Sequence, residues 1–149
     1  MAYQARRNKR YEEDFELVDE NGVVQHTLHV SLDADDMVAK INRKYVALTR
    51  ALTDVQGIKR NEASNEQMQR AIEKLGMAEM DLIEAVFGME AAETIFQFYE
   101  DRYIEMAKEI IPFITSDVIP RLMEIKKENK TMLLKQYKRV KRAKRRGFW

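Results

Sequence analysis

The two histidines are the first candidates for metal binding or acid–base chemistry. His26 and His29 stand three residues apart, a spacing that would place both on one face of a helix. Apolar and polar residues alternate from 24 to 32, which predicts a strand, and an odd spacing on a strand sends two side chains to opposite faces. The sequence therefore predicts one packed and one exposed histidine, and no metal site.

Carboxylates are plentiful between residues 79 and 109, and helical spacing brings Asp101, Glu105 and Glu109 together. A carboxylate-bridged metal pair in a helical bundle normally takes histidines from the same helices, and this segment has none. The chain also has no cysteine, no glycine-rich phosphate loop and no Gly-x-Ser-x-Gly elbow. We interpret these carboxylates as a solvated surface, and we expect no enzymatic activity, no metal and no other cofactor.

Aromatic and methionine side chains support a more specific hypothesis. Phe96, Phe98 and Tyr99 crowd into one predicted helix and span about 160° of its circumference at about 100° per residue. An apolar stripe about 100° wide does not easily hold all three, and methionine repacks readily around varied partners. An ordinary core is the alternative to an exposed groove. The predicted protein-binding groove is lined by Phe96, Tyr99, Tyr103 and Met106.

Basic residues are concentrated near the C-terminus. Eleven basic residues and one acidic residue lie between Lys126 and Arg146, which leaves 15 basic and 24 acidic side chains, a net charge of −9, on the rest of the chain. This asymmetry predicts an anionic partner, which is an acidic protein surface, nucleic acid or the body of a neighbouring copy. A merely solubilising tail is the alternative. The candidate contacts are Lys138, Arg139, Lys141, Arg142, Lys144, Arg145 and Arg146.

The elements that must position these residues begin with a β-hairpin. Two alternating segments, the second from 24 to 32, flank a turn at Asn21-Gly22, where positive φ is tolerated. A lone hairpin is only marginally stable in water. Its apolar face must therefore lie on helices, or its edge must pair with another subunit.

Helical periodicity replaces the alternation from residue 33 onward. It predicts one amphipathic helix that ends near Gly57 and a second that begins at Ser64, which has the capping-box spacing to Gln67. Further helices follow, including a long one from Ile95 to Ile110. Pro112 disfavours helical geometry in the residue before it, so we expect the chain to turn there.

Together these patterns predict a mainly α fold of the α+β class, with an N-terminal β-hairpin followed by a bundle of about five helices. We predict a flexible basic N-terminus at 1–10, a hairpin plus helical domain at 11–125, and a basic C-terminal helix and tail at 126–149. No apolar run approaches the ~20 residues that span a bilayer, and no signal-peptide pattern follows the basic N-terminus. We expect the chain to avoid membranes and to stay where it is made.

Several segments carry a resemblance to a known family. Phe98-Tyr-Glu-Asp-Arg-Tyr, Ile110-Ile-Pro-Phe-Ile, Val118-Ile-Pro-Arg-Leu, the stretch from Met80 to Phe96 and the opening hairpin resemble tail assembly chaperones of long-tailed, siphovirus-like phages of Gram-positive bacteria. The resemblance covers most of residues 11–125. It implies a protein that is made in the host cell cytoplasm and is absent from the mature virion.

The resemblance also implies partners. It implies that the chain binds and solubilises the tape measure protein, helps to recruit the tail tube protein and forms homo-oligomers. Two other functions stay open at this point. One is a nucleic-acid-binding phage regulator or packaging protein that acts through the basic C-terminal tail. The other is a host-interaction protein, such as an inhibitor or trigger of a bacterial defence system.

Overall fold

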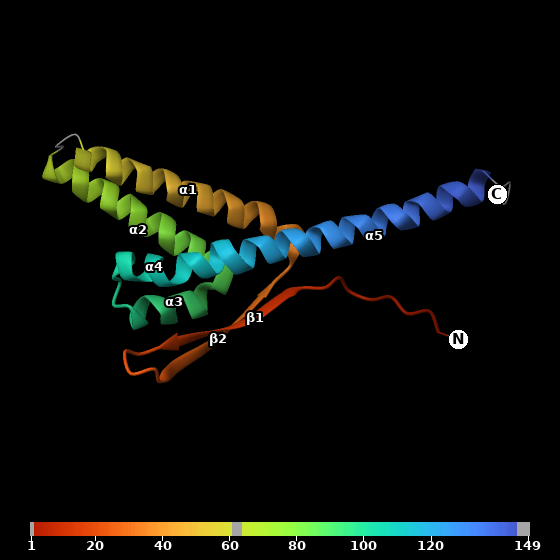
Figure 1. Cartoon of the computed structure of the whole chain (residues 1–149), viewed down its shortest axis with the longest axis horizontal. Coiled ribbons are helices and arrows are strands. Elements are labelled where there is room, and N and C mark those ends of the chain that lie inside the picture. Colours follow the sequence, from red (N-terminus) through yellow and green to blue (C-terminus); the bar gives the residue numbers. More distant parts are fainter. Residues whose placement is uncertain (1, 61–63, 146–149) are drawn as a thin grey trace.

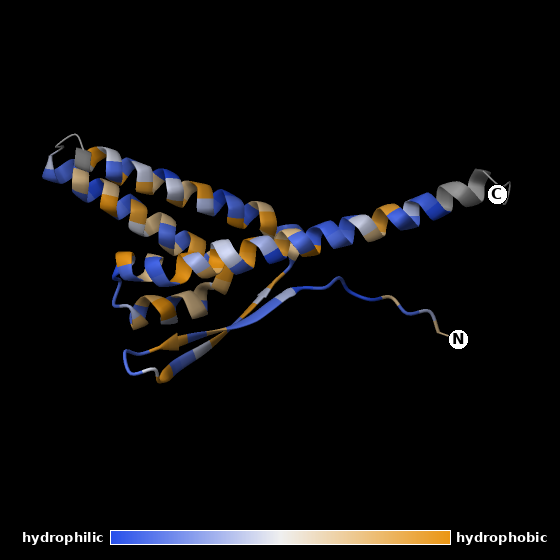
Figure 2. Cartoon of the chain, viewed as in Figure 1, coloured by the Kyte–Doolittle hydropathy of each residue, from blue (hydrophilic) through white to orange (hydrophobic). Residues whose placement is uncertain are grey.

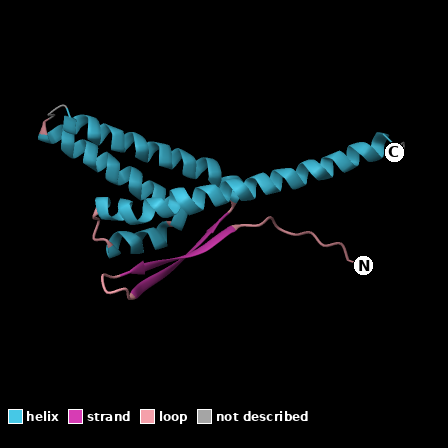
Figure 3. Cartoon of the chain, viewed as in Figure 1, coloured by secondary structure: helices cyan, strands magenta, loops and turns pink. Residues whose placement is uncertain are grey.

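The chain folds as a β-hairpin packed against helices. Figure 1 shows the computed structural model, which describes residues 2–60 and 64–145, with the backbone alone at 59, 60 and 140–145. A mainly helical chain with an N-terminal hairpin confirms the predicted class (Figure 3). The elements are β1 (Tyr11–Val18), β2 (Val24–Leu32), α1 (Ala34–Arg60), α2 (Asn65–Phe87), α3 (Met89–Phe98), α4 (Tyr103–Phe113), the π-helix η1 (Ile114–Val118) and α5 (Ile119–Arg145).

The hairpin turn is organised by its own residues. The Asp19 carboxylate accepts hydrogen bonds from the backbone N–H groups of Asn21 at 2.9 Å and Val23 at 3.0 Å. Gly22 adopts a φ of 81°, a conformation that glycine reaches without steric cost. The turn lies where the sequence predicts it, because all of these interactions are local.

One face of the hairpin packs on the helices. The antiparallel register places Phe15 of β1 opposite Leu28 of β2. The Phe15 ring lies 5.3 Å from the ring of Phe87 on α2 and 4.8 Å from that of Phe113 on α4, measured between centroids. Aromatic pairs at such distances stabilise a core beyond the area that they bury. This three-ring cluster holds the hairpin against the helical body.

Helices α1 and α2 run side by side as an antiparallel pair (Figure 1). The predicted capping box begins α2, because Ser64 Oγ accepts the Gln67 N–H at 3.3 Å and the Gln67 side chain accepts the Ser64 N–H. The predicted end of α1 at Gly57 is wrong, since the helix continues to Arg60. Packing of α1 along α2 outweighs the roughly 1 kcal/mol cost of a glycine inside a helix.

The single helix predicted from Ile95 to Ile110 is in fact two helices. Between α3 and α4 the chain turns through Glu100 and Asp101, whose φ angles are 53° and 58°. The Asp101 N–H donates to the carbonyl of Phe96 at 3.0 Å, a hydrogen bond typical of a helix that ends in a left-handed conformation. Phe96 and Met106, on either side of the turn, are both buried. The helical pattern of apolar residues in the sequence therefore continues across the turn and gives no sign of it.

The predicted turn at Pro112 is also wrong, because α4, η1 and α5 form one continuous helical rod (Figure 3). Proline lacks an N–H and disturbs the α-helical hydrogen bonds around it, and the next turn widens into the π-helix η1. Side chains four positions apart in an α-helix point in directions that differ by about 40°. The wider π-helical turn offsets this difference. Ile110, Ile114 and Val118 therefore all remain buried against the core.

Helix α5 leaves the helical body after Ile125, the last residue of α5 that the structure shows as buried. Figure 1 shows its C-terminal part projecting as a single helix, away from the hairpin turn and the α3–α4 turn. We refer to residues 126–139 as the extension. Among the described residues, no helix is both long and apolar enough to cross a membrane.

Candidate protein-binding groove

An apolar groove lies between α1, α2 and the start of α4. It encloses about 560 Å³ and is lined almost entirely by apolar atoms. Such a lining favours the apolar side chains of a partner over a charged or strongly polar ligand. We refer to this groove between α1, α2 and α4 as the apolar groove. It is lined by Val55 from α1, by Met68, Ile72 and Leu75 from α2, and by Arg102, Tyr103 and Ile104 around the start of α4.

Several side chains of the apolar groove are open to solvent. Ile104 is 84 % exposed and Ile72 is 46 % exposed. Met68, Leu75 and Tyr103 are half-buried. Single exposed apolar residues are ordinary on a protein surface, but a contiguous apolar hollow marks a surface that another protein can cover.

Gly76 allows Tyr103 to form part of this groove. The glycine is buried on α2, and a Cβ atom there would lie 2.9 Å from Cε2 and Cζ of the Tyr103 ring. That distance is shorter than real Cβ contacts, so α4 can approach α2 this closely only because residue 76 has no side chain. By contrast, a Cβ at Gly57 on α1 would have no neighbour within 4 Å among the residues that the structure describes.

Replacing these two glycines should change stability in opposite directions. Gly57→Ala should raise the free energy of unfolding by about 0.5–1 kcal/mol, because alanine is the better helix former. Gly76→Ala has the same gain in propensity but must displace the Tyr103 ring, so we expect a net loss of about 1–2 kcal/mol. Urea unfolding of both variants gives the two values. Equal stabilisation by both substitutions would contradict the close contact between Gly76 and Tyr103.

The four residues predicted to line one groove are divided by the structure. Met106 is fully buried and Phe96 is 9 % exposed, so both belong to the core and do not face a partner. The reason is the turn after α3, which the sequence pattern does not reveal. Tyr103 lines the apolar groove, whereas Tyr99 lines a separate hollow.

The hollow that contains Tyr99 is acidic and lies beside the hairpin turn. It encloses about 580 Å³. Burial, together with the nearby carboxylates of Glu109 and Glu105, raises the pKa of Tyr99. We refer to this hollow as the acidic hollow. Its lining consists of the apolar Phe15, Val18, Phe98 and Tyr99, the carboxylates Glu16, Asp19, Glu20, Glu100, Glu105 and Glu109, and Arg102.

The predicted basic tail begins within α5. Lys138 and Arg139 are exposed on the extension, and the backbone is helical through Arg145. The remaining predicted contacts lie outside the residues whose side chains are described, namely Lys141, Arg142, Lys144, Arg145 and Arg146.

The two histidines point to opposite faces of β2, as predicted. His29 Nδ1 lies 2.8 Å from the Asp14 carboxylate, and this hydrogen bond raises the pKa of His29. The His26 ring lies 6.3 Å from that of Phe98 on α3. Both histidines are exposed, so the expected packed histidine is not found. No cluster of His, Cys, Asp or Glu in the described part of the chain is arranged to hold a metal ion.

Two polar features were not predicted from the sequence. Glu79 is 1 % exposed, and its Oε1 atom has no hydrogen-bond partner among the described residues. Burial raises its pKa to about 8. The Tyr11 hydroxyl donates a hydrogen bond to the carboxylate of Asp117 in η1 (2.5 Å). The spacing of Leu75, Glu79 and Ile83 was the available signal for the first feature, because steps of four keep side chains on one helical face. The second joins residues 106 positions apart and has no local signal.

The chain matches none of the protein families, curated proteins or solved structures with which it was compared. Its function must therefore be inferred from its own surfaces. Three surfaces of the described residues bear on this inference: the apolar groove, the acidic hollow and the extension of α5.

Proposed function

We propose that this chain is a tail assembly chaperone of a long-tailed phage that binds and solubilises the tape measure protein. The observation that supports this most strongly is the apolar groove, in which Ile104 is 84 % exposed. Part of the sequence that resembles such chaperones, residues 98–103, ends at Tyr103 in this groove.

The groove suits an amphipathic helix of the partner. Such a helix can lay its apolar face between α1, α2 and α4, and the flexible side chain of Met68 adapts to different occupants. Each large apolar side chain that leaves water stabilises the complex by about 1.5–3 kcal/mol. One groove covers only a short part of a long helix, so many copies of the chain coat one tape measure protein.

In this proposal the chain works in the host cytoplasm and is absent from the mature virion. Its bound form helps to recruit tail tube protein to the tape measure protein. Binding, exclusion of water and release account for all of these steps, so no catalytic residue or cofactor is required.

Co-expression with the tape measure protein of the same phage tests this proposal. The soluble fraction of the tape measure protein should rise several-fold, and the two proteins should purify together. An unrelated helical protein of similar size serves as the control. A soluble fraction no larger than that of the tape measure protein alone would contradict the proposal.

Nucleic-acid binding by the extension is a second candidate function. It is favoured by six basic residues against one acidic residue in 126–139, and by Tyr137, which is 65 % exposed and available for stacking. This function predicts a mobility shift of DNA or RNA that weakens steeply with salt and disappears when residues 138–149 are deleted. The absence of any shift at low salt would exclude it.

A further inference from the structure

The extension of α5 carries both cations and exposed apolar side chains. Figure 2 shows it as mostly hydrophilic, with a short hydrophobic stretch partway along. Leu133 is 71 % exposed and Tyr137 is 65 % exposed. At about 100° per residue, Leu133, Leu134 and Tyr137 fall within an arc of about 100° that also contains Lys130. The charged residues of the extension are Lys126, Lys127, Glu128, Lys130, Lys135, Lys138 and Arg139.

The acidic hollow has the opposite character. It combines aromatic side chains with six carboxylates, and its one cation, Arg102, already lies 3.3 Å from Glu100 and 3.9 Å from Glu105. Glu16 and Glu109 have no ion-pair partner among the described residues. Lys108 adjoins Glu109 in the chain but does not line the hollow. The hollow is therefore suited to a helix that presents cations around an apolar centre.

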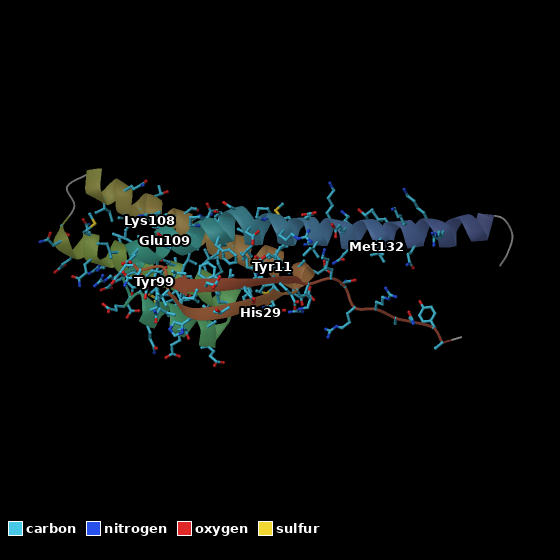
Figure 4. All side chains as sticks on the ribbon, turned by 60° about the horizontal axis from the view of Figure 1, so that its bottom comes forward. Tyr11, His29, Tyr99, Lys108, Glu109 and Met132 are labelled. Atoms are coloured by element: carbon cyan, nitrogen blue, oxygen red, sulfur yellow. The ribbon has the colours of Figure 1, made fainter. Side chains whose placement is uncertain are left out.

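The extension and the acidic hollow lie at opposite ends of the molecule. Figure 4 places Tyr99 and Glu109 toward one end of the long axis and Met132 toward the other. Residues 126–139 form a helical segment about 21 Å long that continues α5 away from the body (Figure 1). The extension cannot reach the hollow of its own chain without a break in α5. Two complementary surfaces at opposite ends can therefore meet only between molecules.

We infer that the extension of one copy docks in the acidic hollow of a second copy, so that copies associate head to tail. The apolar face of the extension meets the aromatic side chains of the hollow, and its lysines meet the carboxylates. Apolar burial provides affinity, and opposite charges set the orientation and speed the encounter. Each added copy leaves one extension and one hollow unused, so further copies can join and form a closed ring or an open filament. The inference uses neither the apolar groove nor the tape measure protein and is independent of the proposed function.

Light scattering coupled to size exclusion tests the association of the full chain. At about 50 mM salt, the weight-average mass should rise with protein concentration above the 17.6 kDa of one copy. At about 500 mM salt the average mass should be lower than at about 50 mM at the same protein concentration, because the attraction between the opposite charges is then screened. A chain that remains monomeric at high concentration in both salts would overturn the inference.

Charge reversal identifies the two surfaces. The extension variant carries Lys130→Glu with Lys138→Glu, and the hollow variant carries Glu16→Lys with Glu109→Lys. All four side chains are exposed, so both variants should melt at the temperature of the wild type. Each variant alone should associate at least about tenfold more weakly than the wild type. An equimolar mixture should recover association, because the carboxylates introduced at positions 130 and 138 of one variant can pair with the amines introduced at positions 16 and 109 of the other.

A matched control carries Glu66→Lys with Glu73→Lys on α2. Both residues are exposed and lie outside the hollow, and the control has the same net charge as the hollow variant. It should assemble like the wild type. Equal loss in the control and the hollow variant, or a mixture of the two reversed variants that stays monomeric, would overturn the inference. A wild-type chain that stays monomeric but shifts a nucleic-acid fragment would overturn it in favour of that partner.

Discussion

The free energy of unfolding should fall by about 3 kcal/mol between pH 4.5 and pH 7 through the ionisation of Glu79 alone. The Glu79 side chain is 1 % exposed, and no residue in the described part of the chain forms a hydrogen bond with its Oε1 atom. Burial disfavours the charged carboxylate and raises its pKa from 4.5 to about 8. The folded chain therefore holds a proton that the unfolded chain releases.

The direction of the pH dependence follows from this difference. Below pH 4.5 both states hold the proton, and the stability is fully present. Between pH 4.5 and about 8 only the unfolded state releases it, so stability falls as the pH rises. Above about pH 8 both states are ionised, and the loss levels off. His29, whose pKa is also raised, loses its contribution in the same direction as the pH rises.

Urea unfolding at a series of pH values between 4.5 and 8 measures the effect. Glu79→Gln has a similar shape and no titration, so the difference between it and the wild type isolates Glu79 from His29. Glu79→Met should be more stable than the wild type at pH 7, because an apolar side chain removes the cost of a buried unpaired group. Parallel stability curves for the wild type and Glu79→Gln would contradict the burial of a neutral carboxyl.

On the proposed function, two charges placed in the apolar groove should strongly weaken binding of the tape measure protein and leave the fold intact. Ile104→Glu with Ile72→Glu puts carboxylates where the apolar face of the partner would lie. The two residues are 84 % and 46 % exposed, so the folded chain loses little when they are replaced. Binding of the partner should weaken at least about 30-fold, which corresponds to about 2 kcal/mol.

Titration calorimetry with a soluble fragment of the tape measure protein measures this loss. Met77→Glu with Met89→Glu is the matched control, because it adds the same two charges at side chains that are 66 % and 78 % exposed and do not line the groove. The control should bind like the wild type, and all variants should unfold at similar urea concentrations. Comparable weakening by the control would show that added charge, and not the groove, is responsible.

Features that depend on neighbouring residues could be predicted from the sequence. The hairpin turn follows from the hydrogen-bonding side chain of Asp19 and the positive φ of Gly22. The capping box of Ser64 and Gln67 likewise needs only a spacing of three. Such local interactions are the same in any fold, so they can be recognised in the sequence without knowledge of the tertiary structure.

Features that depend on distant packing could not be predicted in this way. Glu100 and Asp101 adopt positive φ without glycine, so nothing local indicated the end of α3. Of the predicted groove, Tyr103 alone lines the observed apolar groove, since that groove forms only when α1, α2 and α4 pack together. The contact of Tyr103 with Gly76 joins two helices, and a lone glycine in a helical pattern does not reveal its neighbour.

The proposed function requires that the apolar groove hold a helix of the tape measure protein. Photo-crosslinking detects this contact, with a photoreactive amino acid in place of Ile104 in one variant and in place of Met89 in another. Both positions are exposed, and only the first lies in the groove. Irradiation should join the tape measure protein to the variant at position 104 and not to the variant at position 89. No crosslink at position 104, or equal crosslinking at both positions, would contradict the claim.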